Sequence, residues 1–157
     1  MHTLAFITTH IINQAVISEY KKMSKVKGID CILAIDNTHL KIENNGKLEE
    51  KEFFGTKVKT LFFDEQLNNK LNLPYLYYNR KATNFGEVMW YHSDYRFFYV
   101  KSLLPDYDFY WQFEYDVFCN GDSYSAFFDK YNYKPEDLLI CCFRPEELNG
   151  QWFWVKV

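Results

Sequence analysis

The sequence lacks a basic stripe. Its 18 Lys and Arg residues are outnumbered by 21 Asp and Glu residues, which gives a formal net charge of −3 at pH 7. A protein that binds nucleic acid needs several cations on one face to neutralise backbone phosphates. We therefore expect no nucleic acid as a partner.

The sequence also lacks targeting and membrane segments. The opening MHTLAFITTH has no basic region, and the polar residues Thr8, Thr9 and His10 interrupt its apolar run after a few positions. A signal peptide needs a basic start, and a membrane span needs about 20 apolar residues. We expect neither, and interpret this segment as a first buried strand.

The four cysteines do not have the spacing of a zinc site. Cys141 and Cys142 are adjacent, and these two and Cys31 lie in apolar runs, where a thiol behaves as a small hydrophobic group. Cys119 is the fourth. This usage is typical of a reducing compartment, and we expect a cytoplasmic protein.

The hydropathy pattern predicts one α/β domain over residues 1–157. Continuous apolar runs at 4–8 and 29–35 flank a segment with helical periodicity, which is typical of a βαβ unit in a covered parallel sheet. Residues 37–56 are polar and predict a loop with a weak hairpin. The predicted strands cover 4–8, 29–35, 58–63, 109–116 and 137–143, and the predicted helices cover 12–23, 85–103 and 124–131.

Three predicted strands end in polar residues: Thr8-Thr9-His10, Asp36, and Glu114-Tyr115-Asp116. Ligands of open parallel sheets bind beyond these carboxyl ends. The first of them also begins a predicted helix, whose free N–H groups would favour an anion. Because strand side chains alternate, we expect Glu114 and Asp116 on the same side, where a divalent cation would relieve their repulsion. The alternative is a solvated strand end that has an Arg or Lys partner.

The run YDFYWQFEYDV, with Trp111 three residues before Glu114-Tyr115-Asp116-Val117 and Gly121 after it, resembles the metal-binding signature of a GT-A-like family of glycosyltransferases with a W-x-x-E-x-D-V core. The flanking pattern, from Pro105 to the segment Asp137-Leu138-Leu139, is similar too. FITTH and ILAIDN resemble the first two nucleotide-binding strands of that fold. The resemblance spans residues 4–143, and only 105–139 is specific.

This resemblance implies a three-layer, Rossmann-like (GT-A) fold, with a mostly parallel sheet between helices, that binds a nucleoside-diphosphate sugar. Asp116 would hold Mn²⁺ or Mg²⁺ directly, and Glu114 would reach the metal through water or bind the ribose. Asp36 would face base or ribose. The residues expected around the nucleotide sugar are Thr8, Thr9, His10, Asp36, Arg80, Asn84 and Glu114.

Four of these residues have simpler explanations. Asp36 followed by Asn37 is typical of a turn. His10 fits the start of a helix, and Arg80 fits a solvated loop. Asn84 has capping-box spacing to Glu87 and needs no further role.

The function expected from the resemblance is transfer of a sugar from the nucleotide to an acceptor hydroxyl. No acceptor is indicated, and Asp122, Asp137, Glu146 and Glu147 are equal candidates for a catalytic base. One alternative is a nucleotide-sugar-binding module without turnover. Another is a phosphatase of the haloacid dehalogenase type, which the run Ile35-Asp36-Asn37-Thr38 matches only weakly.

The segment after Asp116 has some forty residues and ends in the apolar QWFWVKV. A GT-A enzyme generally needs acceptor-binding elements after its metal strand. We therefore expect a domain that is incomplete at its C-terminus, lacks the acceptor half, and self-associates through the aromatic C-terminal segment.

Overall fold

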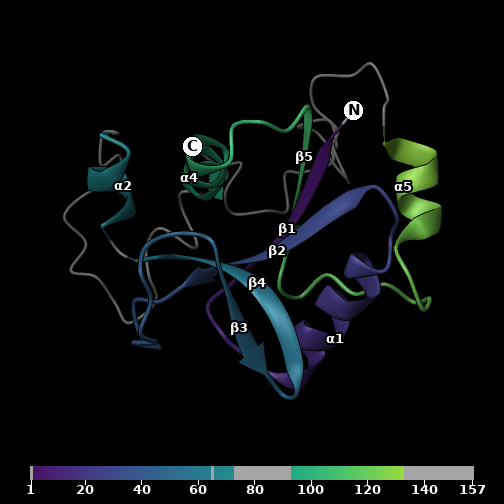
Figure 1. Ribbon diagram of the computed structural model, residues 1–157, viewed down its shortest axis with the longest axis horizontal. Helices are drawn as coiled ribbons and strands as arrows, with labels where there is room; N and C mark the ends of the chain where they lie inside the picture. Colours follow the sequence, from purple (N-terminus) through teal and green to yellow (C-terminus); the bar gives the residue numbers. More distant parts are fainter. Residues whose placement is uncertain (1, 65, 73–92, 133–157) are drawn as a thin grey trace, which may run out of the picture.

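A computed structural model describes residues 2–64, 66–72 and 93–132 of the chain. They form an α/β structure around a sheet whose strands run in the order β3-β4-β2-β1-β5 (Figure 1). The strands are β1 (Thr3–Thr9), β2 (Ile29–Asp36), β3 (Glu49–Phe53), β4 (Thr56–Phe63) and β5 (Phe109–Glu114).

Four of these strands are parallel. β1 pairs with β2 on one side and with β5 on the other, and β2 pairs with β4. Only β3 is antiparallel, because it forms a hairpin with β4. The hairpin turns at Phe54 and Gly55, both with positive φ, a backbone conformation that glycine adopts at low cost.

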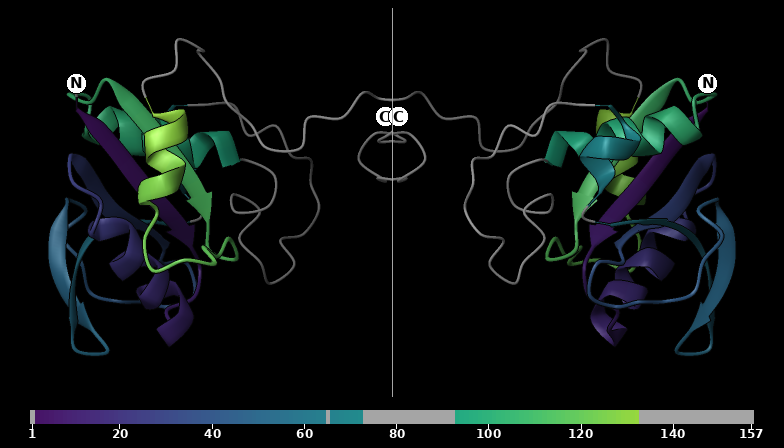
Figure 2. Two further views of the ribbon diagram at one scale, coloured as in Figure 1. Left: turned by 90° about the vertical axis from the view of Figure 1, so that its right-hand side faces the viewer. Right: turned by 90° about the vertical axis from the view of Figure 1, so that its left-hand side faces the viewer.

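Helices cover both faces of the sheet. α1 (Gln14–Ser24) and α5 (Ser125–Tyr131) contribute to one apolar core, and α2 (Leu67–Lys70) and α4 (Ser93–Leu103) contribute to the other. Figure 2 shows the two layers from opposite sides, with α5 and α1 nearer the viewer on the left and α2 on the right. Both faces of β1 and β2 are therefore buried, which explains their continuous apolar sequences.

Successive strands are added to the sheet first on one side of β1 and then on the other. After β1, the strands β2, β3 and β4 all lie on one side of it. The chain then returns, and β5 pairs with β1 on its other side. The strand order therefore changes direction between β1 and β5, at the carboxyl ends of these two neighbouring strands. This is the place where parallel sheets most often bind ligands.

The strands predicted at 4–8, 29–35 and 58–63 are confirmed as β1, β2 and β4, and the weak hairpin is confirmed as β3 with β4. The predicted strand 109–116 ends earlier, at Glu114. Of the predicted helix 85–103, the structure describes 93–103 as α4; residues 85–92 and the predicted strand 137–143 lie outside the described residues.

Candidate functional site at the carboxyl edge of the sheet

Polar side chains gather at the carboxyl edge of the sheet on the face covered by α4. Leu4 and Phe6 of β1 and Ile32 and Ala34 of β2 pack in the α4 core. Because side chains alternate along a strand, the next even-numbered positions share this face. They are Thr8 in β1, Asp36 in β2 and, through its pairing with Thr8, Glu114 in β5.

Glu114 is held by a buried arginine. Arg96, in the first half of α4, donates from Nη1 to Glu114 Oε2 at 3.1 Å and from Nη2 to Oε1 at 2.8 Å. The Arg96 side chain is 2% exposed, whereas that of Glu114 is 40% exposed. Such a bidentate ion pair is stronger and more directional than a single charged hydrogen bond. It joins α4 to the end of β5.

Two further donors complete the surroundings of this carboxylate. Thr8 Oγ1 donates to Glu114 Oε2 at 3.0 Å, and Gln112 Nε2 donates to Oε1 at 3.4 Å. A carboxylate has about four acceptor positions, two on each oxygen. A metal ion or a ribose hydroxyl at Glu114 would have to displace one of these donors.

The contacts of Glu114 therefore favour the alternative weighed from the sequence, a strand-end acid with an arginine partner. They do not fit the expected role of Glu114 as a metal or ribose ligand. Sequence reasoning missed Arg96 because its partner is 18 residues away. The available signal was an arginine among the aromatic residues of the helix SDYRFFYV, where a buried cation needs an anion.

Asp116 lies in a different position from the one expected. β5 ends at Glu114, and the chain turns immediately, with Val117 N donating to Glu114 O at 3.1 Å. The alternation of strand side chains consequently stops before Asp116, which is exposed in the turn. The two acids are thus not consecutive members of one strand face, because one is fixed by Arg96 and the other faces solvent.

His10 directly follows the last residue of β1. Its imidazole contacts the ring of Tyr115 edge-on, with 4.7 Å between ring centroids. Burial lowers the pKa of His10, the carboxylate of Asp36 opposes this shift, and the cation of Arg96 reinforces it, with smaller effects of Glu114 and His39. His10 is therefore a neutral imidazole at pH 7, able both to donate and to accept a hydrogen bond.

Thr9 has a local role. Its hydroxyl donates to Ile11 O at 2.6 Å and accepts from Ile11 N at 3.1 Å, so it closes the turn after β1. The helix begins later than expected. α1 starts at Gln14 and is capped by Asn13, whose Oδ1 accepts from Val16 N at 2.9 Å. The N-terminus of α1 is consequently separated from Thr9 and His10 by three residues, Ile11, Ile12 and Asn13.

Asp36 begins a turn, as one interpretation of the sequence predicted. The residue is 4% exposed, and its Oδ1 accepts from Thr38 N at 2.9 Å. Its Oδ2 accepts no hydrogen bond from any residue in the described ranges. Asp36 is also the carboxylate that acts most strongly on His10. These two expected site residues are therefore neighbours at the ends of β2 and β1.

The remaining expected residues, Arg80 and Asn84, lie outside the described residues, as do the candidate bases Asp137, Glu146 and Glu147. Asp122 is exposed in the segment that follows Asp116. Among the residues of 2–64, 66–72 and 93–132, no group of three or more His, Cys, Asp and Glu residues is arranged to hold a metal ion.

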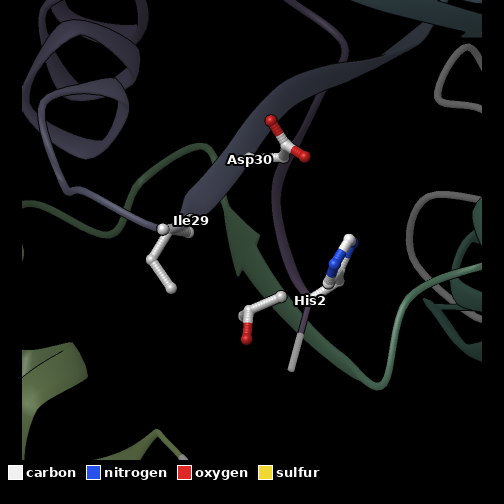
Figure 3. A pocket seen from close by; sticks show the side chains of 5 residues that line it. His2, Ile29 and Asp30 are labelled. Carbon is white, nitrogen blue, oxygen red and sulfur yellow. The ribbon is translucent and has the colours of Figure 1, made fainter.

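A hollow of about 310 Å³ lies at the opposite edge of the sheet, lined by His2, Thr3, Gly28, Ile29 and Asp30. Figure 3 shows His2, before β1, across from Asp30 at the start of β2. The Asp30 carboxylate already accepts from Tyr107 at 3.0 Å and faces Lys59 at 3.7 Å. The hollow lies at the amino-terminal edge of the parallel strands, opposite the edge where such sheets bind ligands.

Comparison with protein-family models, with curated proteins and with solved structures gives no match. Among the helices that the structure describes, none has both the length and the apolar character needed to cross a membrane.

Proposed function

We propose that this protein is a Rossmann-like domain of GT-A type that binds a nucleoside-diphosphate sugar and transfers the sugar to an acceptor hydroxyl. The observation that carries the proposal is the reversal of strand order between β1 and β5, with His10, Asp36 and Arg96–Glu114 gathered at that point. A mainly parallel sheet with this reversal is typical of nucleotide-binding domains.

The described residues divide this site into two parts. In this proposal Asp36 and His10 contact the nucleoside, because a buried carboxylate and an uncharged imidazole can both form hydrogen bonds with its hydroxyl and amino groups. Thr8, Arg96 and Glu114 form a rigid wall between the strand ends and α4. In this proposal Glu114 shapes the site and does not ligate the nucleotide or the metal.

The metal in this proposal is Mn²⁺ or Mg²⁺, held by Asp116. An exposed carboxylate is accessible to an ion, and Mg²⁺ is often bound by one or two carboxylates together with substrate phosphates. The ion would neutralise the charge of the departing diphosphate. A single carboxylate gives little affinity by itself, so metal and nucleotide should bind together.

A thermal-shift experiment tests the proposal. UDP, GDP, ADP and their sugar conjugates are each added with and without Mn²⁺, and EDTA is the control. At ten times the dissociation constant, a ligand stabilises the folded state by about 1.4 kcal/mol. For a domain of this size this corresponds to about 3–6 °C in Tm. If no nucleotide raises Tm with or without Mn²⁺, the chain has no donor site.

A nucleotide-sugar-binding module without turnover is the second candidate. The pairing of Glu114 with Arg96 favours it, because this pair leaves one carboxylate of the E-x-D motif free for metal. Donor hydrolysis, followed by chromatography of the nucleotide product, separates the two functions. A transferase hydrolyses its donor slowly even without an acceptor, whereas a binding module returns it intact.

A further inference from the structure

The chain that follows β5 is held by two side chains of α1. Cys119 N donates to Glu19 Oε2 at 2.9 Å, and Cys119 O accepts from Lys22 Nζ at 2.8 Å. Glu19 and Lys22 lie one helical turn apart and form an ion pair at 2.6 Å. Figure 1 shows the chain between β5 and α5 passing beside α1. Both backbone polar groups of one loop residue are thus bonded by a single helix.

Glu19 is a buried carboxylate that is used mainly for this contact. It is 4% exposed, and its Oε2 also accepts from the Tyr124 hydroxyl at 2.8 Å. Burial acts to raise the pKa of Glu19, but the hydrogen bonds from Cys119 N, Lys22 and Tyr124 outweigh this effect and lower the pKa. Two of these three partners belong to the chain between β5 and α5. The ionised carboxylate therefore fixes this chain on α1.

The same contacts fix the backbone on both sides of Asp116. On one side, β5 ends at Glu114, and Val117 N donates to Glu114 O at 3.1 Å. On the other side, Cys119 is bonded to α1. Tyr115 and Cys119 both pack against the core on the α1 face, whereas the residues between them are exposed. The Asp116 carboxylate therefore reaches solvent from a backbone that is held at two points.

We propose that Glu19 and Lys22 are positioning residues, which hold the turn that carries Asp116 in the geometry needed to bind the divalent ion of the nucleotide diphosphate. This inference rests on the proposed function, in which Asp116 is the metal ligand. A metal ligand in a loop binds well only if the groups around it fix its position. Glu19 and Lys22 contact neither the nucleotide nor the metal in this proposal, and they act only through Asp116.

Glu19→Met tests the positioning role, because it removes the carboxylate and keeps a side chain of similar length. Hydrogen exchange of the Cys119 amide should become faster, since its acceptor is lost. Calorimetry below Tm then measures the affinities for UDP and GDP, each with Mn²⁺ and with EDTA. The ratio of the two affinities gives the contribution of the metal, and it should fall about tenfold. The affinity in EDTA should stay unchanged.

Two further variants show whether the effect passes through Asp116. Lys22→Met is the milder change, because the Lys22 side chain is 24% exposed and water can take its place at Cys119 O. The affinity ratio should fall about threefold in this variant, which carries the test if Glu19→Met does not fold. Asp116→Asn should bring the ratio close to one. Adding Glu19→Met to Asp116→Asn should then have no further effect on the ratio.

Tyr20→Phe is the matched control for a loss of stability. Tyr20 is the neighbour of Glu19 in α1, and its hydroxyl accepts from Lys59 N at 3.1 Å and donates to Cys31 O at 3.4 Å. These bonds join α1 to the sheet and not to the chain after β5. The variant should therefore lower Tm and leave the affinity ratio unchanged.

The outcomes separate this inference from the proposed function. If wild type binds no nucleotide, the proposed function fails. If Mn²⁺ strengthens binding in wild type and Asp116→Asn abolishes this effect, but Glu19→Met and Lys22→Met retain it in full, only the positioning role fails. An equal fall of the ratio in Tyr20→Phe also overturns the positioning role, because the loss would then follow from lower stability.

Discussion

Substitution of Glu114 by glutamine should destabilise the protein through Arg96. The variant keeps the shape of the side chain but removes the negative charge of Glu114 from a guanidinium that is 2% exposed. Removing one member of a fully buried ion pair costs about 3–5 kcal/mol, and an exposed pair contributes about 0–1 kcal/mol. Because the Glu114 side chain is 40% exposed, water can replace part of the lost interaction.

We therefore expect a loss of about 2–3 kcal/mol for Glu114→Gln. This corresponds to a fall in Tm of about 5–10 °C for a domain of this size. Chemical denaturation gives the free energy of unfolding. The sequence alone does not reveal this effect, because it does not show that Arg96 contacts Glu114.

A double-mutant cycle identifies the cause. Arg96→Met removes the cation and keeps an apolar chain of similar length, so Glu114→Gln should cost much less in that background. Asp116→Asn is the matched control, because Asp116 is exposed and makes no ion pair with a residue that the structure describes. If Glu114→Gln changes the free energy of unfolding by less than about 0.5 kcal/mol, Arg96 does not depend on Glu114 and the reasoning is refuted.

Three further predictions concern acids and a histidine. Asp116→Asn should abolish the Mn²⁺-dependent part of the nucleotide-induced rise in Tm, and intact Mn²⁺ binding by calorimetry would contradict the metal assignment. Glu19→Gln should lower the free energy of unfolding, measured in urea, by about 1–3 kcal/mol. Glu19 Oε2 accepts from Cys119 N at 2.9 Å and from the Tyr124 hydroxyl at 2.8 Å, and these bonds connect α1 to the segment after β5. An unchanged free energy of unfolding would show that other groups can replace these bonds. In the folded protein the pKa of His10 lies below its usual 6.5, so the unfolded state binds more protons near that pH. The free energy of unfolding should therefore fall as pH drops through about 6.5. The fall should be smaller in His10→Gln.

The sheet could be predicted from the sequence because the burial of each strand determines the hydropathy of that strand's own residues. A parallel strand segment that is buried on both faces is apolar throughout, and residues 4–7 in β1, 31–35 in β2 and 61–63 in β4 have this property. The positions where these runs become polar also marked the strand ends correctly. Thr8 and Asp36 stand at those ends and face the same side of the sheet.

The charge arrangement of the site could not be predicted in the same way. Whether Glu114 faces a metal or an arginine depends on where α4 places Arg96, and no local pattern around either residue contains that information. The position of Asp116 depends on one backbone hydrogen bond, from Val117 N to Glu114 O, which ends the alternation that the sequence suggests. Both features are set by tertiary packing and turn geometry.

The pairing of Arg96 also determines how a nucleotide diphosphate could bind. Its cation is neutralised by Glu114, so it adds little attraction for phosphate, and the carboxylates of Asp36 and Asp116 add negative charge at the same edge. A diphosphate that approaches these acids alone is repelled, whereas a bound divalent ion reverses the sign of the interaction. The nucleoside contacts at Asp36 need no such ion. In the proposed site, metal dependence should therefore belong to the diphosphate and not to the nucleoside. EDTA should weaken binding of the diphosphate and leave the contacts of the nucleoside with Asp36 unchanged.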